Sequence, residues 1–339
     1  MNGLLSVRCP ACGGEAEVDE QEGFLFCTRC GRIIAKENSI PVPYTLAQLI
    51  EIGDKAADDG DSVALRDTIE MLSSGYSSQT SLLYLGYLSA INGRTDLAFD
   101  VWGLLISFSN DKEDVRKMFP KIISFMGRHL IEESEKGNIL DMEDAELVSY
   151  SYMDRMDPGK ETWENIPYFA EEVAKAALNN ASDIDGKGFR DTLMANLSQL
   201  YLQMIKNDTD LLKVLEFCDL AISAGNSLSS PDTGDTGNKR TVKKELDFFQ
   251  YLKDTVNDGI SEMSDKELSD LEEYWFTRDD DTPFPGEILE EAYIDHAKCD
   301  TSSSVKRMFI RNRWKKRIGK YLDCMLRKTS YQDRISPSH

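Results

Sequence analysis

The sequence predicts a mainly α-helical protein with a small β-rich segment at its N-terminus. Two observations support this fold class. Four of the seven cysteines lie within the first 30 residues, and apolar residues recur at helical spacing from residue 45 onward. No convincing alternation of polar and apolar residues follows Pro43, so we expect the rest of the chain to be all-α.

Two pairs of cysteines define the first element, residues 1–40. Cys9 and Cys12 form one Cys-x-x-Cys pair and Cys27 and Cys30 form another, with fourteen residues between the pairs. Each pair presents two thiolates from a tight turn, which suits tetrahedral coordination of Zn²⁺. Short strands are expected at 17–19, 24–26 and 32–34. We predict one structural Zn²⁺ on all four thiolates, in preference to two disulfides or a redox pair.

The pattern Cys-Pro-x-Cys-Gly followed by Cys-x-x-Cys-Gly-x-Ile resembles a zinc ribbon, in particular the N-terminal ribbon of transcription factor IIB. The resemblance covers about residues 7–36 and implies a fold more than a function, because unrelated proteins carry such ribbons. A site closed by four cysteines leaves no position for substrate, so we expect it to stabilise the segment. Residues 1–40 carry four basic side chains against six carboxylates, which favours protein docking or a purely structural role over nucleic-acid contact.

Residues 41–226 are predicted to form the main body, built from helical hairpins. Thr45 and Gln48 have the spacing of a capping box, which predicts the start of the first helix. A second helix is expected over 61–72. The side chains expected to face inward from these two helices are Leu46, Leu49, Ile50, Ala57, Val63, Ala64, Ile69 and Leu72. Further apolar stripes at helical spacing occupy 163–177, 193–204, 211–222 and 242–260.

One helix pair within this body carries a more specific pattern. Leu85, Gly86, Gly93, Ala98 and Trp102 have the spacing of a tetratricopeptide repeat, which this segment resembles. The resemblance implies that Gly86 lets the second helix approach closely and that Trp102 fills the gap against the next hairpin. A generic antiparallel helical hairpin is the alternative.

A C-terminal helical subdomain is expected over 240–330, after a polar linker at 227–239 rich in Gly and Ser. Its last part, 305–328, carries ten basic side chains and one acid, whereas residues 41–304 have a net charge of −28. Apolar residues recur within it at helical spacing, which predicts a basic amphipathic helix. These apolar residues are Ile310, Trp314, Ile318, Tyr321 and Met325.

The basic helix has two interpretations. Its apolar stripe can pack on the body while the basic face lies near acidic helices. Alternatively, the basic face binds an anionic membrane, a protein groove or nucleic-acid phosphate. The candidate partner-binding residues are Arg311, Arg313, Trp314, Lys315, Lys316 and Arg317.

We predict no catalytic residue. The chain has three histidines, and no second histidine lies near His296 and Cys299 to complete a site. We therefore expect His296 to be a surface histidine and Cys299 an ordinary thiol. For His129 and Glu133, four residues apart, we expect a solvated pair on a helix surface.

Composition narrows the function classes. With 60 acidic and 39 basic residues the net charge is −21, which argues against general nucleic-acid binding. No membrane span or secretory signal is evident, so we expect a cytoplasmic protein. We expect a non-enzymatic adaptor whose acidic scaffold, with its zinc ribbon, binds a protein partner. The alternative is a transcription- or RNA-associated factor whose ribbon docks on polymerase and whose residues 305–328 contact nucleic acid.

Overall fold

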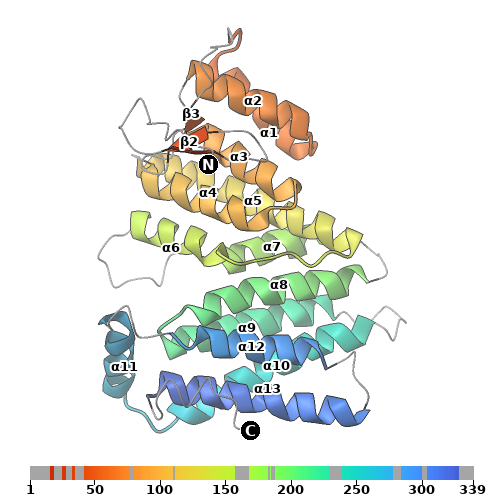
Figure 1. Cartoon of the computed structure of the whole chain (residues 1–339), viewed down its shortest axis with the longest axis vertical. Coiled ribbons are helices and arrows are strands. Elements are labelled where there is room, and N and C mark those ends of the chain that lie inside the picture. Colours follow the sequence, from red (N-terminus) through yellow and green to blue (C-terminus); the bar gives the residue numbers. More distant parts are fainter. Residues whose placement is uncertain are drawn as a thin grey trace, which may run out of the picture. The chain divides into compact units, whose positions relative to one another are not determined.

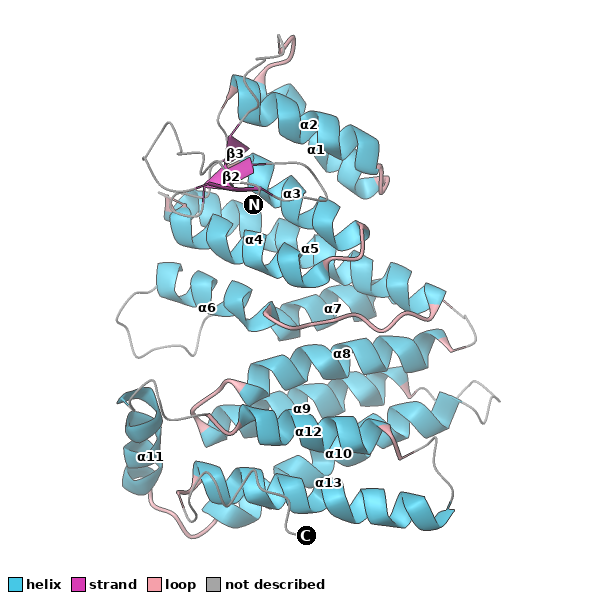
Figure 2. Cartoon of the chain, viewed as in Figure 1, coloured by secondary structure: helices cyan, strands magenta, loops and turns pink. Residues whose placement is uncertain are grey.

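A computed structural model describes three short strands and most of the chain from residue 42 onward. The described residues are 16–18, 25–27, 33–34, 42–76, 79–109, 111–156, 168–181, 184, 188–229, 238–277, 284–299 and 304–327. Within them the protein is mainly α-helical, which confirms the predicted fold class at this level (Figure 1). Figure 2 shows helices as the dominant element.

Thirteen helices occur in the described part of the chain. They are α1 (Leu46–Asp58), α2 (Ser62–Gly75), α3 (Thr80–Ile91), α4 (Thr95–Phe108), α5 (Lys112–Lys136), α6 (Ala145–Met156), α7 (Phe169–Ala181), α8 (Phe189–Lys206), α9 (Leu211–Leu228), α10 (Asn238–Ile260), α11 (Asp265–Thr277), α12 (Gly286–Ala297) and α13 (Ser304–Met325). The strands β1 (Ala16–Val18), β2 (Leu25–Cys27) and β3 (Ile33–Ile34) pair antiparallel in the order β1-β2-β3.

The chain divides into two compact units. The first comprises 1–133 and 140–180, and the second comprises 134–139 and 181–339. Helices α8 and α9, which the sequence analysis grouped with the main body 41–226, therefore belong with α10–α13. Both α8 and α9 pack against α10 within the second unit.

The first two helices of unit 1 begin at side-chain caps. The predicted capping box is confirmed: the Thr45 amide donates to Gln48 Oε1 at 2.9 Å, and the Gln48 amide donates to Thr45 Oγ1 at 3.3 Å. Asp61 caps α2 by accepting from the amide of Val63 at 3.0 Å. The inward orientation expected for Leu46 is wrong, because this residue is 37% exposed. The same expectation is wrong for Val63, which is 67% exposed while Leu65 is fully buried. Two residues apart on a helix point about 200° apart, so only one of them can face the core.

Helices α3 and α4 form a tight hairpin that bears out the close approach expected at Gly86. A methyl group added there would lie 2.7 Å from Trp102 Cδ1, so the indole occupies the space that a side chain would need. Trp102 is fully buried and its Nε1–H donates to the Leu83 carbonyl at 3.1 Å. Trp102 therefore closes its own hairpin. Gly93 supplies the turn, with a φ of +81°.

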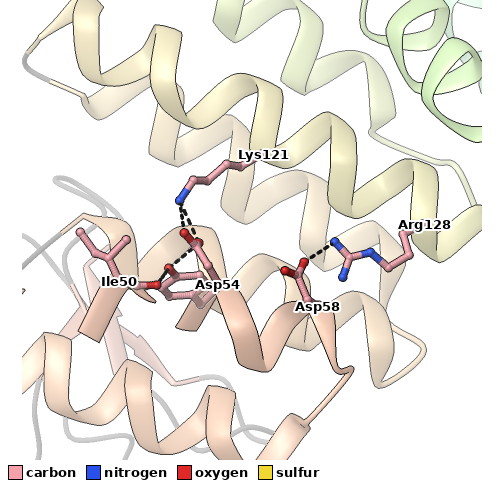
Figure 3. A network of polar contacts seen from close by, with 6 residues as sticks. Ile50, Asp54, Asp58, Lys121 and Arg128 are labelled. Atoms are coloured by element: carbon pink, nitrogen blue, oxygen red, sulfur yellow. Dashed lines mark hydrogen bonds and ion pairs between the residues drawn. The ribbon is translucent and has the colours of Figure 1, made fainter. Parts of the chain in front are cut away.

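Polar contacts tie α5 to α1 in unit 1 (Figure 3). Lys121 Nζ lies 2.6 Å from Asp54 Oδ2, and Arg128 Nη2 lies 2.9 Å from Asp58 Oδ1. The Tyr84 hydroxyl of α3 donates toward Asp54 Oδ1 at 2.8 Å, with the Ile50 carbonyl 2.9 Å away. Burial and the neighbouring Asp54 raise the pKa of Tyr84 far above its usual value. The network links three helices that are distant in sequence.

The core of unit 2 is formed by the stripes expected from the sequence. Those of α8 and α13 are buried throughout: Leu193, Leu197, Leu200, Tyr201, Met204, Ile310, Trp314, Ile318, Tyr321 and Met325. In α10, Val242, Phe249, Val256 and Ile260 are buried as well. Helix α13 packs against α12 and α10. The apolar stripe of this basic helix is therefore part of the core of unit 2.

Candidate binding pocket

The apolar side of α13 is not available to a ligand. Trp314 is 3% exposed, and its ring packs against His296 with centroids 4.9 Å apart and against Tyr251 at 5.2 Å. The packing interpretation of the stripe is therefore confirmed. A helix held by this side offers a ligand its remaining sides, which carry the basic residues.

One basic row of α13 is occupied by carboxylates of α12. Arg313 Nε donates to Asp295 Oδ2 at 2.6 Å, and Arg317 Nε lies 3.0 Å from the same oxygen. Arg317 also pairs with Glu291. The Asp295 side chain is only 6% exposed, so two guanidinium groups compensate for the burial of its charge. Arg313 and Arg317 thus hold α13 on α12.

A second basic row of α13 faces α10 across an open pocket of about 440 Å³. The row consists of Arg307, Arg311 and Lys315, which follow one another at four-residue intervals. Helix α10 contributes Lys243 and Lys244 on the opposite wall. The five cations share the pocket with two carboxylates, Asp247 and Asp254, among the described lining residues. The pocket is therefore cationic although the whole chain is strongly acidic.

Aromatic side chains form part of the pocket wall. The Lys315 ammonium lies 4.2 Å from the centroid of the Tyr251 ring, a cation–π distance. Burial lowers the pKa of Lys315 and the positive charge of Arg311 lowers it further, while the carboxylate of Asp247 offsets part of the shift. A bound anion would offset both effects, because it would compensate for the lost hydration and for the repulsion between the two cations.

The structure separates the six predicted partner-binding residues into groups. It brings Arg311, Trp314 and Lys315 together in the pocket and places Arg313 and Arg317 on α12 carboxylates. Lys316 is exposed and does not line the pocket.

Sequence reasoning missed the residues that other helices contribute to the pocket. His296, expected at the surface, is 3% exposed and lines the pocket together with Cys299. His129 is likewise buried rather than solvated, and its Nε2 lies 3.4 Å from Thr95 Oγ1. A usable signal was present in α10, where Lys243, Asp247 and Gln250 recur at helical spacing.

Of the four predicted zinc ligands, the structure describes Cys27 alone. Its side chain is fully buried at the end of β2, where it faces Ala16 of β1. Cys9, Cys12 and Cys30 lie outside the described residues. Elsewhere, the described residues contain no group of three or more His, Cys, Asp or Glu side chains arranged to hold a metal ion. The zinc site stays a prediction.

Comparisons with protein-family models, curated proteins and solved structures gave no match to this chain. None of the helices in the described ranges combines the length and apolar character needed to cross a membrane. The pocket of unit 2 is therefore the feature from which a function is proposed.

Proposed function

We propose that this protein is a non-catalytic adaptor: a zinc ribbon followed by an acidic helical-hairpin scaffold that binds a protein partner. The observation that carries the proposal is the cationic pocket of unit 2, with Arg311 and Lys315 on one wall and Lys243 on the other. Charged and aromatic groups grouped in an open pocket are suited to recognising an oppositely charged surface. Binding a partner there requires no catalytic chemistry.

The scaffold part of the proposal rests on the helix pairs. Consecutive helices pack on each other from α1 to α4 within unit 1, and α8, α9 and α10 do so within unit 2. The α3–α4 pair has the close approach at Gly86 that its resemblance to a tetratricopeptide repeat implies, whereas the contacts of Trp102 with Gly86 and Leu83 lie within its own hairpin and not against the next one. Repeated hairpins present extended surfaces on which partner segments dock.

The zinc part of the proposal rests on Cys27 and the two Cys-x-x-Cys pairs. A buried thiol at the end of a short antiparallel strand fits a ligand held by a hairpin between two metal-binding turns. Zn²⁺ on Cys9, Cys12, Cys27 and Cys30 would supply folding free energy that so small a segment lacks. Four thiolates fit a reducing compartment, so a cytoplasmic location belongs to the proposal.

Metal analysis tests the zinc site. We expect one zinc per purified chain, and Cys27→Ser should lower both the zinc content and the resistance of residues 1–40 to proteolysis. Cys218→Ser is the matched control, because Cys218 is a buried thiol in the core of α9. Cysteines 9, 12, 27 and 30 found paired as disulfides would contradict the zinc site.

Recovery of the partner tests the adaptor function. The tagged full chain is purified from its host with and without nuclease, and bound proteins are quantified by mass spectrometry. We expect one dominant protein that survives nuclease treatment. Polymerase subunits, or a complex that nuclease disperses, would instead favour the transcription- or RNA-associated factor, which the basic character of α13 also allows.

A further inference from the structure

The geometry of the pocket points to the chemistry of its partner. We propose that it receives an extended acidic segment of a partner protein, whose carboxylates at alternate positions pair with Arg311 and Lys315. This inference rests on the proposed adaptor function, since it names the segment that the adaptor recognises.

Spacing is the first argument. Residues four apart on a helix are displaced by about 6 Å along its axis, so Arg311 and Lys315 lie about 6 Å apart along α13. Alternate residues of an extended strand lie on one side, about 6.6 Å apart. Two carboxylates at alternate positions of an extended segment therefore match the spacing of these two cations.

Charge is the second argument, and α13 provides its own precedent. On its other side, Arg313 and Arg317 pair with Asp295 and Glu291 of α12, a precedent for the charge pairing alone, because α12 is a helix. In the pocket the cations outnumber the carboxylates by five to two among the described lining residues. Carboxylates from a partner would form the same kind of pair with Arg311 and Lys315.

Other features of the pocket favour a peptide over a nucleic-acid strand. Asp247 and Asp254 would repel the anionic groups of either ligand, but a peptide also has backbone N–H groups that can donate to them, and a phosphate backbone has no such donor. Recognition of single strands also uses open aromatic faces for base stacking. Trp314 is 3% exposed, and the ammonium of Lys315 lies over the ring of Tyr251. Trp314 therefore offers no open face for stacking, and Lys315 already covers one face of Tyr251.

Fluorescence anisotropy with the full chain tests this inference. The probes are a labelled peptide with three glutamates alternating with serine, a peptide of the same composition with the glutamates contiguous, and a single-stranded oligonucleotide of equal charge. We expect the alternating peptide to bind most tightly, and its affinity to fall as salt rises.

Two variants and a control test whether the alternating peptide binds in the pocket. Arg311→Glu with Lys315→Glu should weaken binding of the alternating peptide at least about tenfold, because two charge-assisted contacts become repulsive. Lys243→Glu on the facing wall should weaken it less, by about threefold to tenfold. The control, Lys306→Glu with Lys316→Glu, makes the same charge change at exposed positions of α13 outside the pocket and should change the affinity less than about threefold.

The outcomes separate the inference from the function beneath it. Absence of peptide binding, tighter oligonucleotide binding, or equal loss in the control would overturn the acidic-segment inference. If Arg311→Glu with Lys315→Glu misfolds, as judged by its melting temperature, Lys243→Glu decides alone. A chain that keeps its native partner despite loss of peptide binding would keep the adaptor function and lose the inference. Peptide binding without any native protein partner would overturn the adaptor function, and with it the assignment of the pocket to a partner segment.

Discussion

Gly86→Ala tests the helix approach that defines the α3–α4 hairpin. The added methyl group would lie 2.7 Å from both Cδ1 and Cε2 of Trp102, and closer still to Nε1. Trp102 is fully buried and donates to the Leu83 carbonyl, so the indole cannot move aside without losing that hydrogen bond. Either the ring or helix α4 must shift.

The expected cost follows from three contributions. Overpacking a buried site costs about 1–3 kcal/mol. A buried indole N–H left without its acceptor costs about 1–3 kcal/mol more, whereas replacing glycine by alanine in a helix returns about 1 kcal/mol. We expect a net loss of about 1–5 kcal/mol in the free energy of unfolding, and at the centre of that range, about 3 kcal/mol, a fall of roughly 6–12 °C in the melting temperature of unit 1.

Thermal unfolding followed by circular dichroism measures this loss. Gly103→Ala is the matched control in the same hairpin, since its added methyl group meets its nearest atom, Ser151 Oγ, at an ordinary 3.5 Å. We expect the control to be neutral or slightly stabilising. In a Trp102→Leu background, Gly86→Ala should lower the free energy of unfolding much less than it does in the wild type. A Gly86→Ala protein as stable as Gly103→Ala would refute the close-approach reasoning.

The remaining predictions concern polar groups of both units. Tyr84→Phe should lower the free energy of unfolding by about 1–2 kcal/mol in urea titrations, because it removes the hydroxyl donor to Asp54. Lys121→Met should cost less than about 1 kcal/mol, since its pair with Asp54 is partly exposed, and a larger loss than in Tyr84→Phe would contradict this ranking. Burial raises the pKa of Asp208 from 3.8 to about 6. The folded state thus binds more protons than the unfolded state between about pH 4 and 6, and this carboxyl lowers stability as pH rises through that range. Asp208→Asn should therefore gain about 1–3 kcal/mol over wild type at pH 7 and little at pH 4, and an equal gain at both would contradict the shift.

The helices were predictable where local signals act alone. The capping box at Thr45 depends on residues three apart, and the stripes of α8 and α13 depend on a single helical period. The prediction was wrong for Val63 because apolar character alone does not say which side of the first turn faces the core. The burial of His129 was missed for a related reason, since its environment comes from α4 rather than from its own helix.

The pocket was only partly predictable. The sequence identified Arg311, Trp314 and Lys315 as candidates but could not separate them from Arg313 and Arg317, whose partners lie on α12. Which side of a basic helix is already neutralised depends on helices packed around it, and periodicity within one helix carries no such information. The contribution of α10 was missed for the same reason.

Site-directed photo-crosslinking in the native host tests the central claim most directly. A crosslinking residue is placed at Gln250, an exposed residue of the pocket wall, and separately at Lys316, which is exposed on α13 outside the pocket. The account predicts a crosslink from position 250 to an acidic segment of one protein, and little from position 316. A crosslink from position 250 to nucleic acid, or protein adducts from position 316 alone, would contradict it.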